Sequence, residues 1–493
     1  MTPPPDLSAK GGQHEMPDFL NRKSGGGVIK FGTDGWRALM TRDFTIENVA
    51  IVAQAYADYL KESRPGKAPA RIAVGYDFRM NSEVFAKRFT EVLIANGVTV
   101  HLSDRACPTP AVSFAIVNGK FDGGIAITAS HNPADYNGVK IKSDYGGSAE
   151  KNITDGVERQ LGKNPVISKL FVPGIPEIRN LNDPYLVYLK KYLNLDVIKE
   201  APYRVLIDSM HGVGNGHIED ILSGGKIRVT TIRGERDVTF GGIAPEPIPK
   251  NLLRASELMK KGDFDLCVAT DGDADRVGAI RPGGEFISPG IILSLIMIHF
   301  VEDLKKTGSV VTTISNTALI YKVAKKLGLK IHETPIGFKY VCDIMRRENV
   351  LIGGEESGGI GFQNYLYERD GMLSGLLLMQ MMAMRRQNFE EILRSVEKEF
   401  GKLHYVRSDL DYPNELKPKL FEALAKDLTI DLGGHHLKEV NRQDGVKYVL
   451  DDDSWLLFRL SGTEPILRIY SEATSKELAE SLVRQGGEFA FSL

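Results

Sequence analysis

Gly124-Ile125-Ala126-Ile127-Thr128-Ala129-Ser130-His131-Asn132-Pro133 is the stretch of this chain that says most about its fold. Its first four residues are small or apolar and predict a short buried strand. The strand leads to a serine with a histidine beside it, and Pro133 can begin the next element without a backbone donor. A serine in this place is suited to act as a nucleophile or as a phosphoryl carrier. Ser/Asn/Pro stretches also form ordinary turns, so this stretch alone leaves both interpretations open.

The stretch from Phe264 to Arg276 joins a predicted strand to an acidic loop. Residues 264–270 are mostly apolar, and Asp271-Gly272-Asp273-Ala274-Asp275-Arg276 follows directly. Carboxylates at alternate positions can converge on one hard cation and leave positions open for phosphate oxygens. A calcium EF-hand would need glycine and glutamate where this chain has Arg276 and Pro282. A solvated acidic turn is the alternative, and we favour a magnesium site formed by Asp271, Asp273 and Asp275.

The composition is that of an ordinary globular protein. The 493 residues are enough for about two to four domains. The net charge is -2, with both signs interspersed, so no polybasic surface favours nucleic acid or an anionic membrane as a partner. The three cysteines, Cys107, Cys267 and Cys342, fit no disulfide framework or zinc spacing. We therefore expect reduced thiols in a cytoplasmic protein.

The first 27 residues predict a disordered N-terminal tail. They are rich in proline, glycine and polar residues and lack the apolar core of a signal peptide. Two apolar runs, Ile291–Phe300 and Met372–Met384, are too short to cross a bilayer, which needs about 20 residues. We expect both runs to form buried helices and expect no membrane association.

Strand and helix patterns divide the rest of the chain into four regions. Between residues 28 and 180, the predicted strands Arg71–Asp77 and Val98–Leu102 flank a helical stretch, Glu83–Asn96, as is typical of βαβ units. Similar patterns predict α/β regions over residues 181–287 and 288–397. Over residues 398–493 the pattern changes to a smaller α+β domain, with predicted strands at Val446–Leu450, Trp455–Leu460 and Ile466–Ser471 and a helix from Ser475.

Six motifs follow one another along the chain in an order that resembles a known family. They are Phe31–Arg37, Thr128–Pro133, Asn137–Lys140, Asp271–Arg276, Gly354–Gly359 and Arg459–Pro465. The set resembles the α-D-phosphohexomutase superfamily, which includes phosphoglucomutases, phosphomannomutases and phosphoglucosamine mutases. The resemblance covers nearly the whole chain beyond residue 27. It implies an α/β fold with three similar α/β domains, with mixed and largely parallel sheets, and a smaller C-terminal α+β domain around a central cleft.

The resemblance also implies a reaction. Ser130 would carry a phosphoryl group and give it to the free hydroxyl of a hexose monophosphate. The resulting hexose 1,6-bisphosphate would turn in the cleft and return its other phosphate to Ser130. Glucose 1,6-bisphosphate is therefore expected as intermediate and activator, and hexose phosphates as the small-molecule partners. The bound Mg2+ would contact Asp271, Asp273, Asp275 and a phosphate oxygen on Ser130.

Further residues take expected roles around this serine. Lys140 could act as general base or acid if its pKa is lowered, and otherwise would stabilise phosphate charge. His131 would shuttle a proton or orient the serine loop. The guanidinium groups of Arg37 and Arg276 are expected to hold the phosphate that is transferred.

The phosphate that does not react needs its own anchor. A turn between two predicted strands offers a guanidinium, hydroxyls and glycine amides that suit a dianion, at Arg459, Ser461, Gly462 and Thr463. The resemblance assigns sugar hydroxyls to Glu355 and Ser357, and Lys339 is expected to contact sugar or phosphate.

Two departures from the pattern bear on the sugar. Phosphomannomutase-type members often end the sugar loop with histidine, where this chain has Gly359, and their serine-asparagine phosphate turn is Ser461-Gly462 here. The leading hypothesis is therefore a phosphoglucomutase that also acts on mannose phosphates. Phosphomannomutase and phosphoglucosamine mutase are the alternatives within the superfamily, and a phosphatase or a non-catalytic sugar-phosphate sensor are alternatives of other classes. The expected oligomeric state is a monomer or a homodimer.

Overall fold

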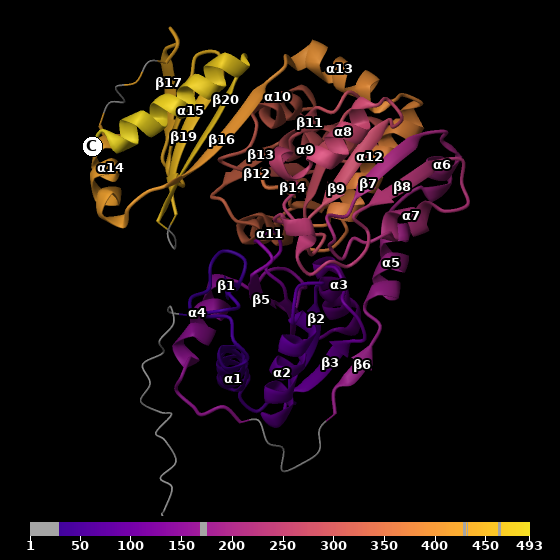
Figure 1. Cartoon of the computed structure of the whole chain (residues 1–493), viewed down its shortest axis with the longest axis vertical. Helices are drawn as coiled ribbons and strands as arrows, with labels where there is room; N and C mark the ends of the chain where they lie inside the picture. The colour runs from indigo at the N-terminus through magenta and orange to yellow at the C-terminus, as the bar shows by residue number, and fades with distance from the viewer. Residues whose placement is uncertain (1–28, 168–174, 427–429, 431, 462–464) are drawn as a thin grey trace, which may run out of the picture.

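Four β-sheets organise the computed structural model, which describes residues 29–167, 175–426, 430, 432–461 and 465–493. In Figure 1 the first sheet lies in the lower half, the second and third lie above it, and the fourth stands to one side. The four units follow one another along the chain, so the architecture confirms three α/β units and a C-terminal unit of a different kind.

The first sheet has the order β1-β5-β4-β2-β3-β6. Parallel pairs join β4, β2, β3 and β6, whereas β5 runs antiparallel to both of its neighbours. Its strands are β1 (Trp36–Leu39), β2 (Arg71–Tyr76), β3 (Thr99–Ser103), β4 (Gly123–Ile127), β5 (Tyr136–Lys142) and β6 (Glu177–Arg179). Its helices are α1 (Ile46–Ser63), α2 (Ser82–Ala95), α3 (Thr109–Gly119) and α4 (Lys151–Gln160). The strand expected before Ser130 is confirmed as β4.

The second sheet has the order β11-β10-β9-β7-β8. Its strands are β7 (Arg204–Asp208), β8 (Arg228–Ile232), β9 (Leu266–Thr270), β10 (Val277–Ile280) and β11 (Phe286–Ile287). The helices of this region are α5 (Asn182–Lys191), α6 (Leu195–Glu200), α7 (His217–Leu222) and α8 (Leu253–Lys260). The strand expected before the acidic loop is confirmed as β9.

The third sheet has the order β13-β12-β14-β15. Its strands are β12 (Ser309–Thr313), β13 (Ile331–Thr334), β14 (Val350–Gly354) and β15 (Ile360–Phe362). The accompanying helices are α9 (Pro289–Ile298), α10 (Ala318–Lys326), α11 (Phe338–Arg347), α12 (Gly371–Arg385) and α13 (Phe389–Phe400). Helices α9 and α12 are buried over nearly their whole length, as expected from the two apolar runs.

One topology occurs in all three α/β units. In each, three parallel strands lie in the order third-first-second, and a fourth strand pairs antiparallel with the third. The fourth strand is β5, β10 or β15, and the loop before it leaves the carboxyl end of β4, β9 or β14. Ligands of open α/β sheets bind beyond these carboxyl ends. Three loops therefore occupy the same place in three successive units. They are the serine loop (Thr128–Pro133), the acidic loop (Asp271–Arg276) and the sugar loop (Gly354–Gly359).

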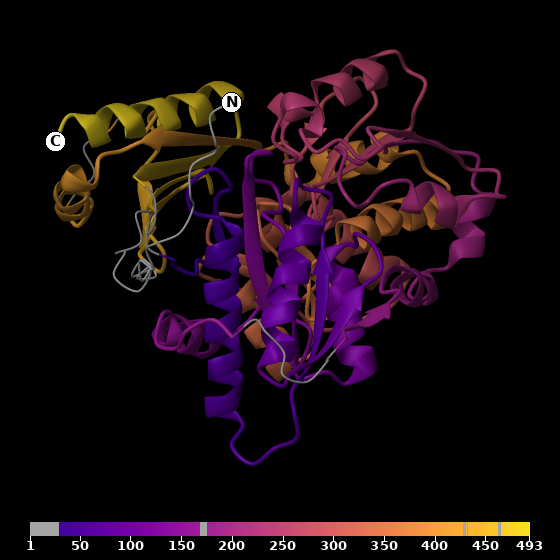
Figure 2. The ribbon, with the colours of Figure 1, turned by 60° about the horizontal axis from the view of Figure 1, so that its bottom comes forward.

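The fourth sheet is antiparallel, in the order β16-β20-β19-β18-β17, and α15 covers one of its faces (Figures 1 and 2). Its elements are β16 (His404–Asp411), β17 (Leu437–Asn441), β18 (Val446–Leu450), β19 (Trp455–Leu460), β20 (Ile466–Ala473), α14 (Lys417–Leu424) and α15 (Lys476–Phe491). The three expected strands and the final helix are confirmed. The edge strands β16 and β17 were not expected, because their side chains are half-buried or exposed and give no apolar run.

The apolar cores show which units are joined. One continuous cluster of buried side chains runs through the second and third units, includes α9 and α12, and extends into the first unit through α3 and the strands that it covers. The first unit has a second cluster of its own, and the fourth unit has a separate one. A small cluster of Ile314, Trp455, Leu457 and Tyr470 packs the fourth sheet against the end of β12. Among the described residues, none of the helices is long and apolar enough to cross a membrane.

The N-terminus of α12 offers a test of this packing. Asp370 is fully buried, caps the helix by accepting from the Leu373 amide at 2.9 Å, and accepts from the hydroxyls of Tyr185 and Tyr365 at 2.7 and 2.8 Å. Asp370→Ala should cost roughly 3 kcal/mol or more, because it removes a cap and leaves two buried hydroxyls unpaired. We expect the thermal midpoint of unfolding to fall by about 5 °C or more.

Asn388→Ala is the matched control, because Asn388 caps α13 with a capping box and holds no buried tyrosine. It should cost only about 1 kcal/mol. Equal shifts of the midpoint for the two variants would contradict the packing described for Asp370.

Candidate active site

The serine loop, the acidic loop and the sugar loop meet at one place. A Cβ built on Gly272 would lie 2.5 Å from the Ser130 carbonyl oxygen, so the first two loops touch through their backbones. The Val277 amide donates to the Gly358 carbonyl at 3.0 Å, and Arg276 forms an isolated bridge with Gly359. Segments more than 200 residues apart in the sequence, near Ser130 and Gly359, therefore border one small volume.

Ser130 is fully buried and points at the acidic loop. Its hydroxyl donates to Asp271 Oδ2 at 2.6 Å, and its amide donates to Thr128 Oγ1 at 2.8 Å. The Thr128 hydroxyl in turn donates to Asp77 Oδ2 at 2.6 Å. The backbone of Ser130 has a φ of 51°, in the left-handed region that non-glycine residues rarely adopt. Strained backbone of this kind persists where the surroundings hold it in place, and it is concentrated at functional sites.

Arg79 fixes the backbone of the serine loop, and no motif in the sequence marked it. Its guanidinium is fully buried and donates to four carbonyl oxygens of the loop and of β5, at 2.6 to 3.1 Å: those of Ser130, Asn132, Pro133 and Tyr136. One rigid side chain therefore fixes the backbone on both sides of His131. Its position just after β2, at the carboxyl edge of the sheet, was the signal that could have identified it.

The three aspartates of the acidic loop lie together and are fully buried. Their oxygen atoms lie within 4.8 Å of one another. Burial and the charges of Asp273 and Asp275 raise the pKa of Asp271 well above its ordinary value. Burial acts in the same direction on Asp273, but the Lys140 ammonium and hydrogen bonds from Lys140 and Thr109 hold its pKa below the ordinary value. The loop therefore concentrates negative charge that needs cationic neighbours.

This donor set fits a divalent cation. Asp273 Oδ1 and Asp275 Oδ1 are buried and have no hydrogen-bond partner in the described part of the chain. Asp271 Oδ1 accepts from the Arg276 amide at 3.0 Å, which orients that carboxylate. Carboxylate oxygens that converge in this way, with a serine hydroxyl beside them, are the ligands that Mg2+ accepts.

Lys140 lies among these carboxylates. Its ammonium is 2.7 Å from Asp273 Oδ2, 2.8 Å from Asp275 Oδ2 and 3.0 Å from Asp34 Oδ2, and its side chain is 1% exposed. Burial alone would lower the pKa of Lys140, but the three carboxylates raise it above the ordinary value. The lowered pKa that a general base would need is absent from this arrangement. The geometry fits the other expected role, stabilisation of charge.

Arg369 is a second residue that the sequence analysis missed. It precedes α12 and connects all three regions of the site, since it donates to Asp34 Oδ2 and Asp275 Oδ2 at 2.7 Å and lies 3.5 Å from Glu355 Oε2. A Cβ built on Gly359 would lie 2.1 Å from Arg369 Cδ. Any residue larger than glycine at position 359 would therefore clash with Arg369 as it is placed here. No motif in the sequence marked Arg369.

Arg37, on β1, lies close to the ring of His131, the residue that follows the serine. Arg37 donates to Asn132 Oδ1 at 2.9 Å and to Asp34 Oδ2 at 3.2 Å, and one of its nitrogens lies 3.4 Å from His131 Nδ1. Burial, with Arg276 and Arg37 nearby, holds the pKa of His131 well below its ordinary value. The ring is therefore neutral near pH 7 and can accept or donate a hydrogen bond.

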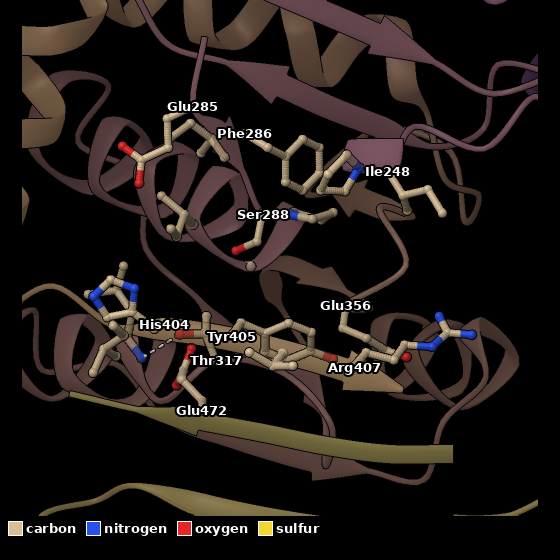
Figure 3. A pocket seen from close by; sticks show the side chains of 18 of the residues that line it. Ile248, Glu285, Phe286, Ser288, Thr317, Glu356, His404, Tyr405, Arg407 and Glu472 are labelled. Carbon is tan, nitrogen blue, oxygen red and sulfur yellow. Dashed lines mark hydrogen bonds between the residues drawn. The ribbon is translucent and has the colours of Figure 1, made fainter. Parts of the chain in front are cut away.

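The predicted sugar-binding residues lie at two places. Glu355 is buried, and this burial raises its pKa to about 7 although Arg369 opposes the shift. Ser357 lines a cavity of about 1000 Å³ where the second, third and fourth units meet. Figure 3 shows Tyr405 and Arg407 on one wall of this cavity, opposite Phe286 and Ser288. Ser130 and the aspartates are not part of its lining.

Lys339 lies apart from that cavity, in a small recess beside the first motif. It shares the lining of the recess with Thr33, Asp34 and Ser148. Burial and the charge of Lys151 lower the pKa of Lys339.

The predicted phosphate anchor lies on the fourth sheet. Arg459, at the end of β19, donates through Nε to Asp444 Oδ2 at 3.1 Å. The charges of Asp444 and Glu356 both act to raise the pKa of Arg459. The Ser461 carbonyl accepts from Lys417 at 2.8 Å. Gly462 and Thr463 lie outside the described residues. Arg459 therefore belongs to a different unit from the sugar loop and lies within electrostatic range of Glu356 in that loop.

Three α/β units whose equivalent loops meet around a serine and three aspartates define the α-D-phosphohexomutase superfamily, as the motif order suggested. Comparison with protein-family models agrees. The phosphoglucomutase/phosphomannomutase α/β/α domains I, II and III match residues 28–166, 183–284 and 289–400, and the C-terminal domain matches 410–485. The chain belongs to the phosphoglucomutase/phosphomannomutase family. It is a phosphohexomutase, an isomerase that transfers phosphate within hexose phosphates.

Individual relatives span nearly the whole chain. A phosphoglucomutase/phosphomannomutase of Thermococcus kodakarensis is 30% identical over 460 residues, which cover 92% of this chain and 97% of that protein. A phosphoglucosamine/phosphogalactosamine mutase of Sulfurisphaera tokodaii is 29% identical over 471 residues, with the same coverage. A Thermus thermophilus crystal structure assigned as a phosphomannomutase is 33% identical and superimposes with a TM-score of 0.83, covering 94% of this chain and 100% of that one.

The contact between the serine and acidic loops can be tested by Gly272→Ala. The new methyl group would clash with the Ser130 carbonyl, a backbone atom that cannot swing aside, so the loops must separate. Since a displacement of about 1 Å can cost on the order of a hundredfold in rate, we expect kcat to fall by about that factor. The measurement is steady-state mutase activity.

Gly487→Ala in α15 is the control, because its methyl group would meet only the flexible Leu410 side chain at 3.3 Å. It should leave kcat nearly unchanged, because this buried position lies in the fourth unit and the new methyl group would meet neither the serine loop nor the acidic loop. Unchanged kcat in Gly272→Ala would show that the two loops need not touch.

Proposed function

We propose that this phosphohexomutase is a Mg2+-dependent phosphoglucomutase, which interconverts glucose 1-phosphate and glucose 6-phosphate and also acts on mannose phosphates. The observation that carries the proposal is the hydrogen bond from Ser130 to Asp271, made inside a cluster of three buried aspartates. A phosphoryl group on this hydroxyl would lie beside the donor set for the cation.

In the proposed reaction Ser130 is phosphorylated at rest. A free hydroxyl of the hexose monophosphate attacks the phosphorus, the bond from phosphorus to Ser130 Oγ breaks, and the proton of the attacking hydroxyl is passed to Ser130 Oγ. The product is a hexose 1,6-bisphosphate, which turns in the site. The Ser130 hydroxyl then takes the other phosphoryl group and releases the isomeric monophosphate. A distant structural neighbour from Aspergillus fumigatus, 14% identical, is an N-acetylphosphoglucosamine mutase variant in complex with glucose 1,6-bisphosphate.

The side chains of this chain supply charge and position. Asp271, Asp273 and Asp275 would hold Mg2+, which withdraws charge from the phosphoryl group. Lys140 would stabilise the developing negative charge, since its high pKa keeps it an ammonium. Arg37 and Arg276 would hold the oxygens of the transferred group. Neutral His131 would hold or pass the proton of the attacking hydroxyl, because it lies 3.5 Å from Ser130 Oγ.

The preference for glucose rests on the sugar loop. Glu355 and Ser357 would bind sugar hydroxyls, and Lys339, on α11 of the third unit, would contact sugar or phosphate from the recess that it shares with the first unit. Because residue 359 is glycine, Arg369 can occupy the space that a side chain at position 359 would take, and it extends to Glu355. This pairing supports a sugar site unlike that of members with histidine at this position. A phosphoglucosamine mutase is the second candidate, favoured by the similarity to the relative from Sulfurisphaera tokodaii.

Asp273→Asn tests the metal site. The substitution removes one anionic ligand and keeps the shape of the side chain, so the Mg2+ concentration for half-maximal activity should rise on the order of tenfold. The measurement is activity against Mg2+ concentration. Asp263→Asn, an exposed carboxylate of the same unit, is the control and should leave the curve unchanged. An unchanged curve for Asp273→Asn would place the metal elsewhere.

Substrate choice is tested with glucose, mannose and glucosamine 1-phosphates, each with Mg2+ and a trace of its 1,6-bisphosphate. Glucose 1-phosphate should give the highest kcat/KM, with no release of inorganic phosphate. Ser130→Ala should remain folded and lose nearly all turnover, because it removes the phosphoryl carrier. Fastest turnover of glucosamine 1-phosphate would replace phosphoglucomutase by the second candidate, and release of phosphate from all three would identify a hydrolase.

A further inference from the structure

The turn between β17 and β18 docks the fourth sheet on the third unit. Asn441 Nδ2 donates to Glu333 Oε1 at 2.5 Å, and Gln443 Nε2 donates to the Glu333 carbonyl at 3.3 Å. Asp444 Oδ2 accepts from the Ile336 amide at 2.9 Å. The turn therefore contacts the end of β13 and the loop that leads to Lys339.

The same turn is pressed against β19 at Arg459. Gly445 has a φ of +86°, and a Cβ built on it would lie 2.2 Å from the Phe458 carbonyl and 3.2 Å from Arg459 Cα. Only glycine fits this close approach. The approach brings the carboxylate of the preceding residue, Asp444, to Arg459.

Asp444 consequently has two partners in different units. One carboxylate oxygen, Oδ2, accepts both from the Ile336 amide at 2.9 Å and from Arg459 Nε at 3.1 Å. A carboxylate that binds Nε leaves the two terminal nitrogens of the guanidinium available, and these nitrogens can form a fork for a phosphate. The side chain of Arg459 is 15% exposed, so its position is largely set by its neighbours.

The surroundings of Arg459 favour an anion. Arg468 lies directly opposite Arg459 across the β19–β20 pair. Like charges opposite each other destabilise a sheet unless an anion or a carboxylate compensates them. Asp409 compensates Arg468 from a distance of 3.8 Å, and Asp444 compensates Arg459. A bound phosphate would add to this compensation.

We propose that Asp444 is a positioning residue, which orients Arg459 for the non-reacting phosphate of the substrate and makes this phosphate site depend on docking of the fourth sheet against the loop at Ile336. The inference rests on the role proposed above for Arg459. If it is correct, binding of the phosphate by Arg459 and docking of the fourth sheet on the third unit both depend on one atom, Asp444 Oδ2.

The test is a double-mutant cycle on the full-length enzyme. Asp444→Ala should raise KM for the hexose 1-phosphate about tenfold, the equivalent of one hydrogen bond to a charged group, with kcat changed by less than about twofold. Asp444→Asn keeps an acceptor oxygen and should recover most of the loss. Arg459→Ala should raise KM further, and the double variant should have the same KM as Arg459→Ala.

Two controls separate orientation from docking. Gln443→Ala removes a docking contact without touching Arg459, and Glu439→Ala removes an exposed carboxylate of the same hairpin. Glu439→Ala should leave KM unchanged, whereas Gln443→Ala should raise KM by much less than Asp444→Ala does, because the contact between Asp444 and the Ile336 amide still docks the sheet. In Asp444→Ala, the concentration of glucose 1,6-bisphosphate needed for full activity should also rise, because a poorly held intermediate escapes more often.

Unchanged KM in Asp444→Ala would overturn the inference, as would independent, multiplying effects in the double variant. If none of the three hexose 1-phosphates is turned over, the proposed function fails separately. Calorimetric titration with inorganic phosphate then tests the four proteins of the cycle: the wild type, Asp444→Ala, Arg459→Ala and the double variant. About tenfold weaker binding by Asp444→Ala supports the inference, and equal binding contradicts it.

Discussion

The three buried carboxylates of Asp271, Asp273 and Asp275 impose the constraint on which the rest of the site depends. Burying an uncompensated carboxylate is so unfavourable that the fold must bring cations to it. Lys140 from the first unit and Arg369 from the third both contact Asp275, at 2.8 and 2.7 Å. The charge of the acidic loop therefore draws the first and third units together around the second.

A repeated topology makes this meeting possible. Each α/β unit places a loop between its third parallel strand and an antiparallel fourth strand, at the carboxyl edge of the sheet. One loop carries the serine, the next the aspartates, and the last Glu355 and Ser357. Arg79 and Arg369 then fix the loops, Arg79 through backbone carbonyls and Arg369 through carboxylates. Arg459 on the fourth sheet interacts electrostatically with Glu356 in the last of these loops.

Local patterns in the sequence predicted the strands β4 and β9 and the residues that follow them, because buried strands leave continuous apolar runs. They also predicted the buried helices α9 and α12. Contacts between units could not be predicted from local patterns, since the hydrogen bond between Ser130 and Asp271, for example, joins residues 141 positions apart. Arg79, Arg369 and Asp444 were missed because each acts through partners on other elements, within one unit for Arg79 and between units for Arg369 and Asp444. The edge strands β16 and β17 were missed because they carry no apolar run.

The most direct test of the account is transfer of a labelled phosphoryl group from glucose 1,6-bisphosphate to the enzyme. The protein is mixed with labelled bisphosphate and Mg2+, quenched within one turnover, digested and mapped by mass spectrometry. The account predicts about one phosphoryl group per chain, on the peptide that contains Ser130, and its loss when glucose 1-phosphate is added. Turnover of glucose 1-phosphate without a label on Ser130, or with the label on another residue, would contradict it.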